Sequence, residues 1–450
     1  MTEPFDLLVV GAGIHGAGLA RDAAGRGLRV LLVDQGDIGG ATSSASTKLI
    51  HGGLRYLEHF AFGLVREALA EREVLLSIAP HLVRAQRFVI PYAAAQRPRW
   101  LLRLGLALYD GLARGSSLER SEALALRGAP FGAPLKPEFA EGFAYSDLAT
   151  DDARLTLLNA LSAAQLGAQV MTRTKLLGAR RAGGLWRAVL QAADGTQREC
   201  AARIVVNAAG PWAAEVRRLL SGAAGPEALR LVKGSHLVVP KRYEGEQAYL
   251  LQNADGRIAF VIPFERDFSL VSRFFRRPLT PQQAVWSFAG IRALYDAGRD
   301  SASALSRESR LILDGAQQAP LLSIYGGKLT TYRRLAERAL ERLKPWLPGL
   351  RPSWSAAVHL PGGGLGRSGL AGLLPAAAAG VARGPGAPPR HGGRARARPG
   401  ANRVRSGRAF RRRSLCGGGR LPSRPRVGAR GRRHSLAQDE MRPAPGRRGA

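Results

Sequence analysis

Cysteines and acidic residues are scarce in this sequence of 450 residues, and long apolar runs are absent. The two cysteines, Cys200 and Cys416, are too far apart to indicate a disulfide framework or a metal site, which favours a reducing compartment. No uncharged apolar run reaches the roughly 18 residues of a spanning helix. The stretch from Met1 to Asp6 also lacks the basic and then apolar pattern of a secretory signal. We therefore expect that the protein does not cross a membrane.

The shortage of acidic residues leaves a formal net charge of +33, which is unevenly distributed. Residues 362–450 contain 21 Arg and no Lys, with Asp439 and Glu440 as their only acids. Such charge would normally indicate nucleic acid, an anionic membrane or an acidic ligand as a partner. More than half of the excess positive charge lies in residues 362–450. The net charge therefore says little about the partners of residues 1–361.

The same segment, from Gly362 onward, has no hydrophobic periodicity, and Phe410 is its only aromatic residue. It cannot bury enough apolar surface to offset its conformational entropy, so we predict a disordered tail over residues 362–450. A frame change in a GC-rich gene would explain the abundance of Arg, Gly, Ala and Pro. The alternative is a basic tail that binds RNA or DNA. The lack of stacking aromatics favours the frame change, and no specific nucleic acid partner is expected.

The body of the chain begins with a pattern typical of a nucleotide-binding fold. Residues 5–10 form a short apolar run typical of a strand buried on both faces, residues 14–24 suit a helix, and residues 28–33 suit a second buried strand. Further apolar strands at 202–208 and 320–325 also end in glycines. We predict an α/β fold with one Rossmann-like domain assembled from separated segments, and a second α+β lobe inserted between them.

A glycine fingerprint follows the first strand and opens the first helix. Gly11 permits a tight turn, Gly13 lets a pyrophosphate approach the backbone, and Gly16 lets helix and strand pack closely. Asp34 ends the next strand, where it can accept a hydrogen bond from a ribose hydroxyl. The fingerprint indicates a dinucleotide but does not separate NAD from FAD.

A second motif, from Gly40 to Leu57, joins small hydroxyl residues to a glycine pair and an Arg-Tyr pair. Here the sequence resembles the flavin-dependent, membrane-associated glycerol-3-phosphate dehydrogenases. The resemblance covers about residues 5–361 and continues through 145–155, 206–212, 233–236, 288–292 and 326–332. It implies FAD as cofactor, with no metal. The cofactor-binding residues that we expect are Gly11, Gly13, Gly16, Asp34, Thr42, Ser43, Ser44, Ser46, Thr47, Lys48, Gly52, Gly53, Gly210, Gly327, Lys328, Leu329 and Thr330.

A phosphorylated substrate held beside a flavin needs positive charge with directional donors, which Arg and Lys supply. The candidates are Arg55, with its neighbour Tyr56, and Arg292, Arg307 and Lys328. A solvated surface role is the usual alternative for such side chains. Because Arg55, Arg292 and Lys328 lie inside the motifs, they are favoured as substrate-site residues. For Arg307 both roles remain open.

His236 follows a Gly-Ser turn, and its unperturbed pKa near neutrality suits a proton acceptor. It would take the C2 hydroxyl proton while the C2 hydride passes to flavin N5. A purely structural histidine is the alternative, in which case Arg55, Arg292 or Lys328 would tune the alcohol electrostatically. The positive end of a helix that opens at Lys328 would stabilise the reduced, anionic flavin.

The resemblance implies oxidation of sn-glycerol 3-phosphate to dihydroxyacetone phosphate, with electrons passed to a membrane quinone at the cytoplasmic membrane face. Association with the membrane would be peripheral, and residues 97–106 mix Arg, Trp and Leu as an interfacial helix does, unless they pack on the core. Family members often form homodimers, which the sequence does not test. The rivals are a glycerol-3-phosphate oxidase that uses oxygen and an inactive flavoprotein remnant with a nucleic-acid-binding tail.

From these motifs we place the FAD-binding domain at residues 1–85, 146–230 and 286–361, and the substrate lobe at residues 86–145 and 231–285. Two departures from the family stand out. A turn and a strand are missing near residues 271–285, and the arginine-rich segment replaces a C-terminal helical domain.

Overall fold

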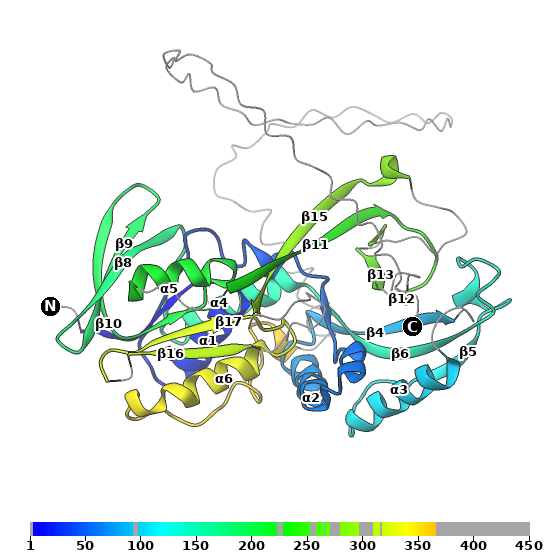
Figure 1. The fold of residues 1–450 in the computed structure, drawn as a ribbon, viewed down its shortest axis with the longest axis horizontal. Helices are drawn as coiled ribbons and strands as arrows, with labels where there is room; N and C mark the ends of the chain where they lie inside the picture. Colours follow the sequence, from blue (N-terminus) through cyan, green and yellow to red (C-terminus); the bar gives the residue numbers. More distant parts are fainter. Residues whose placement is uncertain are drawn as a thin grey trace, which may run out of the picture. The chain divides into compact units, whose positions relative to one another are not determined.

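The computed structural model describes residues 3–92, 98–222, 228–252, 258–265, 267–270, 280–296, 309–315 and 317–365. Within this part of the chain the strands form one eight-stranded and one nine-stranded sheet (Figure 1). The substrate role of Arg307, the shortening near residues 271–279 and the disorder of residues 366–450 concern residues outside this description and stay predictions.

The eight-stranded sheet has the order β16-β17-β10-β1-β2-β7, with β9 paired to β10 and β8 paired to β9. Its central strands β2, β1, β10 and β17 run parallel, so their carboxyl ends meet at one edge. The strands are β1 (Phe5–Val10), β2 (Val30–Val33), β7 (Gln169–Met171), β8 (Thr174–Ala182), β9 (Leu185–Ala192), β10 (Gln197–Asn207), β16 (Arg310–Asp314) and β17 (Leu321–Tyr325).

Strand β1 shows why a continuous apolar run suits the centre of this sheet. Leu7 and Val9 pack into one hydrophobic cluster, with helices α1 (Ile14–Gly25) and α6 (Tyr332–Leu343), whereas Leu8 and Val10 pack into another, with Trp186. Successive side chains of a strand point to opposite faces, so a strand covered on both faces needs apolar residues at every position. This confirms the predicted Rossmann-like β1-α1-β2 unit.

Helices pack on both sheets, and the first of them, Ile14–Gly25, matches the helix predicted at residues 14–24. The described helices are α1 (Ile14–Gly25), α2 (Phe62–Ile78), α3 (Arg99–Leu112), α4 (Asp152–Gln165), α5 (Ala213–Ser221) and α6 (Tyr332–Leu343). Helix α6, yellow in Figure 1, packs against α1 and begins at Tyr332, later than the Lys328 start that we predicted. Gly326 and Gly327 have φ angles of +68° and +95°, and the Thr331 N–H donates to the Lys328 carbonyl, so a turn precedes the helix.

The nine-stranded sheet has the order β15-β11-β14-β13-β12-β4-β6-β3, with β5 paired to β6. The longest pairing joins β11 to β15, two green strands that form a ribbon in Figure 1. The strands are β3 (Leu49–Ile50), β4 (Val83–Tyr92), β5 (Glu122–Ala125), β6 (Glu141–Thr150), β11 (Ala228–Pro240), β12 (Ala248–Gln252), β13 (Ile258–Phe264), β14 (Phe268–Leu270) and β15 (Trp286–Asp296).

Helix α3 packs on this second sheet through its inner face. Leu106 and Tyr109 are buried in a cluster with Phe88 and Tyr145 of the sheet. The short 3₁₀ turns in the described residues are η1 (Thr42–Ser44), η2 (Leu54–His59), η3 (Pro130–Gly132), η4 (Gly210–Trp212), η5 (Pro281–Gln283), η6 (Lys344–Trp346) and η7 (Gly363–Leu365). No helix in the described part is long and apolar enough to span a membrane.

The proposed domain boundaries do not coincide with the limits of the two sheets. β15 pairs with β11 in the nine-stranded sheet, although the sequence boundaries group residues 286–296 with the FAD-binding segments. β6 likewise pairs with β4 and continues to Thr150, beyond the boundary that we placed at residue 146. A division by sheet would therefore move both strands to the substrate lobe.

Candidate functional site

A cavity of about 1780 Å³ is lined by residues from both sheets. The residues that follow β1, β2, β10 and β17 form one wall, and residues of β4, β11, β12, β13 and β15 form another. Ligands of open α/β sheets bind outside the carboxyl ends of the strands, which is where this cavity lies.

The glycine loop places the amino end of α1 at the cavity. Gly11 has a φ of +106°, and a Cβ there would lie 2.6 Å from the carbonyl oxygen of Ala208. A Cβ on Gly16 would lie 1.8 Å from the Gly11 oxygen, so glycine is needed for the predicted close packing of helix and loop. The Ile14 N–H donates to Ser43 Oγ at 2.9 Å. The amino end of α1 at this loop carries partial positive charge, which suits a pyrophosphate.

Asp34 lines the cavity directly after β2, and its carboxylate is held at both oxygens. One oxygen accepts the Ala12 N–H at 2.6 Å and the other accepts the Gly36 N–H at 2.8 Å. Each carboxylate oxygen has a second lone pair, so a ribose hydroxyl can still donate to Asp34.

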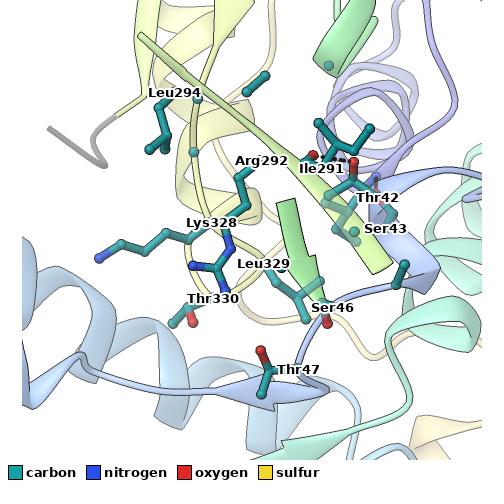
Figure 2. A pocket seen from close by; sticks show the side chains of 18 of the residues that line it. Thr42, Ser43, Ser46, Thr47, Ile291, Arg292, Leu294, Lys328, Leu329 and Thr330 are labelled. Atoms are coloured by element: carbon teal, nitrogen blue, oxygen red, sulfur yellow. Dashed lines mark hydrogen bonds between the residues drawn. The ribbon is translucent and has the colours of Figure 1, made fainter. Parts of the chain in front are cut away.

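The hydroxyl run after β2 brings several of its members to the cavity (Figure 2). Thr42 Oγ1 donates to the carbonyl oxygen of Ile291 at 2.7 Å, which ties this run to β15. Ser43, Ser46 and Thr47 also line the cavity. Four of the predicted cofactor residues do not line it, namely Gly16, Ser44, Lys48 and Gly52.

The candidate substrate residues in the described part of the chain line the same cavity. In Figure 2 the Arg292 side chain points toward Thr330 and Thr47, whereas the Lys328 side chain extends away from them. The Lys328 Nζ lies 3.7 Å from the centroid of the Tyr56 ring. Arg55, His236 and Tyr56 line this cavity as well.

His236 lies opposite Phe288 in the β11–β15 pairing, and the two rings stack with centroids 4.6 Å apart. Its Nε2 lies 3.4 Å from Thr47 Oγ1. Burial lowers the pKa of His236, the positive charges of Arg292 and Lys48 lower it further, and Asp152 opposes them. A neutral imidazole is therefore favoured at pH 7, as a proton acceptor requires.

Two histidines that line the cavity, His15 and His51, lie inside the sequence motifs, but the sequence analysis assigned them no role. Burial lowers the pKa of His15 to about 4, and its ring would lie 2.5 Å from a Cβ on Gly327. The His51 N–H donates to Thr330 Oγ1 at 3.2 Å, so it ties the glycine pair to the loop before α6. In the sequence, only their positions next to Gly16 and Gly52 could have indicated that they belong to the site.

An apolar branch of the cavity reaches the outer face of α3. Phe60, Leu101, Leu104 and Leu108 line it and are exposed, with 78% of Phe60 and 56% of Leu104 accessible. Trp100 is also exposed, next to Leu101. Helix α3 thus packs on the sheet on one side and presents apolar residues on the other, so the two expectations for this helix are not exclusive.

Taken together, the amino end of α1, the Asp34 carboxylate and the large cavity fit a dinucleotide such as FAD, with the fingerprint loop for the pyrophosphate and Asp34 for the adenosine ribose. Among the described residues, no group of His, Cys, Asp and Glu side chains could hold a metal ion. The fold and the site therefore define a dinucleotide-binding protein.

Comparisons with known proteins agree. The family model described as "DAO: FAD dependent oxidoreductase" matches residues 6–333. The glycerol-3-phosphate dehydrogenase of Pseudomonas aeruginosa is 48% identical over 392 residues, covering 81% of this chain and 76% of the relative. The D-erythritol 1-phosphate dehydrogenase of Brucella abortus is 44% identical over 394 residues, covering 81% and 78%. The solved glycerol-3-phosphate dehydrogenase of Bacillus halodurans, complexed with FAD, has a TM-score of 0.63 at 28% identity, covering 85% of this chain and 73% of that one.

The chain therefore belongs to the FAD dependent oxidoreductases, among the glycerol-3-phosphate dehydrogenases. This confirms the predicted family, fold class and cofactor. The alignment of 392 positions uses only 81% of 450 residues, so this chain has gaps where the Pseudomonas protein has residues. Such gaps agree with a shortened substrate lobe without locating the shortening.

Proposed function

We propose that the protein oxidises sn-glycerol 3-phosphate to dihydroxyacetone phosphate. The observation that carries this proposal is that Arg292, Lys328 and Arg55 line the same cavity as His236, a histidine whose pKa is lowered. The cations would bind the phosphate, and His236 would accept the C2 hydroxyl proton as the C–O bond becomes a carbonyl. FAD, when bound, accepts the hydride that leaves C2.

The cations have separate tasks in this proposal. The Arg292 guanidinium is a planar fork that can hold two phosphate oxygens, whereas the Lys328 ammonium is a compact charge. Tyr56 lies against the Lys328 ammonium, which restricts where that charge can move. The phosphate would thus be fixed at one end of the substrate, leaving C2 beside His236.

A test of the substrate is anaerobic mixing of the purified flavoprotein with sn-glycerol 3-phosphate, which should bleach the flavin absorbance. Erythritol 1-phosphate should be run in parallel, because one relative bears the name of that activity. Bleaching only by the longer substrate, or by neither, would contradict the proposed substrate.

The site assignment is tested by Arg292→Leu and Lys328→Met. Loss of a charge-assisted contact to phosphate costs about 1.5–3 kcal/mol, so kcat/KM should fall roughly tenfold or more. Flavin content should fall far less than kcat/KM. An unchanged kcat/KM in both variants would remove these residues from the substrate site.

We also propose that the electrons pass to a membrane quinone and that the protein associates peripherally with the cytoplasmic membrane face. The exposed apolar residues of α3 and the apolar branch of the cavity support this, since both would suit a lipid surface and an apolar acceptor. Reoxidation rates of the reduced flavin with a short-chain quinone and with oxygen decide between a dehydrogenase and an oxidase. Faster reoxidation by oxygen would favour the oxidase.

A further inference from the structure

A short turn, Ser46 to Lys48, separates the cavity from α4. Lys48 has a φ of +59°, a left-handed conformation that is uncommon for a residue other than glycine. Its ammonium forms an ion pair of 2.5 Å with Asp152, whose side chain is fully buried. A strained backbone held by a buried ion pair indicates that the turn is fixed in place.

Asp152, at the start of α4, holds this turn through more than the ion pair. Its Oδ2 accepts both the N–H of Ser46, at 2.9 Å, and the hydroxyl of Ser46, at 2.7 Å. The Thr150 N–H donates to the Lys48 carbonyl oxygen at 2.9 Å. The turn is therefore anchored from one side by residues about a hundred positions later in the chain, an interval of 104 residues for the ion pair.

The other side of the turn faces His236. Thr47 Oγ1 lies 3.4 Å from His236 Nε2, the nitrogen that faces the turn. The Lys48 Nζ lies 5.7 Å from the centroid of Phe288, whose ring stacks on His236 with an interplanar angle of 14°. One edge of the histidine ring and its stacking partner thus both meet residues of the same turn.

We propose that Lys48 and Asp152 form a positioning pair, which fixes the Ser46–Lys48 turn and thereby holds the His236 ring between Thr47 and Phe288. This rests on the proposed function, in which His236 accepts the substrate proton. Neither Lys48 nor Asp152 lines the cavity, so the pair acts through its neighbours and does not touch the substrate. This assigns Lys48 a role other than the FAD contact that the sequence predicted.

The pair also sets the charge around His236. Of the charged groups in the described residues, Arg292 on β15 and Lys48 on the turn lower the pKa of His236 and Asp152 on α4 raises it, while burial is the largest cause of the lowering. Removing the ammonium with Lys48→Met should therefore raise the pKa of His236. Removing the carboxylate with Asp152→Asn should lower it. For screened charges at this range, a shift of about half a pH unit is expected in each direction.

The experiment is an NMR titration of the FAD-loaded protein with labelled histidines, in which His236→Gln identifies the His236 signal. Lys48→Met and Asp152→Asn should move its pKa in opposite directions, and Lys48→Arg, which keeps the charge, should stay near the parent value. Lys241→Met is the matched control. Lys241 directly follows β11, the strand that carries His236, but its ammonium pairs with the exposed Glu244. Lys48→Gln replaces Lys48→Met if the latter is not recovered folded.

The outcomes separate the two proposals. Opposite shifts, with matching shifts of the acidic limb of the pH profile of kcat/KM, support the positioning pair. Equal pKa values in the parent, Lys48→Met and Asp152→Asn overturn it, as would equal shifts in Lys241→Met. Retention of the same acidic limb in His236→Gln would instead refute His236 as the proton acceptor, whatever the NMR shifts show.

Discussion

The residues of the proposed substrate site owe their charge states to their surroundings. Burial and neighbouring cations keep His236 neutral near pH 7, whereas Arg292 keeps its charge at any ordinary pH. A neutral base can therefore lie beside a cationic phosphate site, and protonating it would add a further positive charge there. Because the pKa of His236 is lowered, this arrangement survives into mildly acidic solution and is lost only as the pH falls through the lowered value.

The roles of two glycines in the loop, one in FAD binding and one in folding, can be separated experimentally. We predict that Gly13→Val abolishes FAD binding but leaves the fold intact, because a Cβ on Gly13 meets only the rotatable Ser43 hydroxyl, at 3.1 Å. Gly16→Val should instead disrupt folding, since its Cβ would lie 1.8 Å from the Gly11 carbonyl oxygen. Flavin content and thermal unfolding by circular dichroism measure the two effects. A folded Gly13→Val protein with a full complement of flavin would contradict the pyrophosphate assignment.

How much of the site the sequence predicts depends on the distance between partners. The fingerprint, Asp34 and the hydroxyl run were located because each belongs to a continuous motif with a known mechanical reason. The Lys48–Asp152 ion pair was not found, because it joins residues 104 positions apart. His15 and His51 were visible in motifs, but only the folded chain shows that both line the cavity.

At the scale of elements, a buried ionic network joins α2 to α6. The Arg333 guanidinium donates to Glu71 on α2 at 2.9 and 2.5 Å and also pairs with Glu337 on its own helix. The Arg333 and Glu71 side chains are 6% and 5% exposed, so water cannot replace a lost partner. This network fixes the helix that follows the Lys328 loop.

We predict that Glu71→Ala lowers the free energy of unfolding by about 3 kcal/mol, because it leaves a buried guanidinium with fewer partners. Glu67→Ala is the matched control, since Glu67 joins the same two helices through Arg338 with side chains 27% and 42% exposed. Its cost should be at most about 1 kcal/mol. Urea unfolding of both variants tests this, and equal losses would show that burial does not govern the strength of these pairs.

The elements themselves differ in how well the sequence predicts them. The β1-α1-β2 unit follows from local apolar runs and glycine punctuation, and it forms as predicted. The β11–β15 ribbon could not be predicted, because it pairs Ala228 with Asp296 across a long interval. Pairing partners of that kind depend on the fold around them, which sequence periodicity does not encode.

At the scale of the whole molecule, residues 354–360 stabilise the flavoprotein through contacts that their composition does not predict. Trp354 donates to the Asp22 carbonyl oxygen at 3.1 Å, and the Arg21 guanidinium lies 4.8 Å from the Trp354 ring centroid. Arg21 also donates to the carbonyl oxygen of Val358 at 2.7 Å, and Leu360 is buried with its N–H donating to Ile78. The contacts of Trp354 and Val358 clamp α1, the helix whose amino end lies at the pyrophosphate loop, and Leu360 holds the last residue of α2.

We therefore predict that a chain ending at Leu365 retains FAD, whereas a chain ending at Leu350 loses it. The described residues that line the cavity lie between Val10 and Thr330, so neither truncation removes a cavity residue. Only the shorter chain removes Trp354, Val358 and Leu360, and with them the clamp on α1. The ratio of flavin absorbance to protein concentration after gel filtration measures the effect. If both truncated chains lose flavin equally, residues beyond 365 contribute to the flavoprotein, and the arginine-rich segment is not an accidental addition. If both retain it, the clamp on α1 is dispensable.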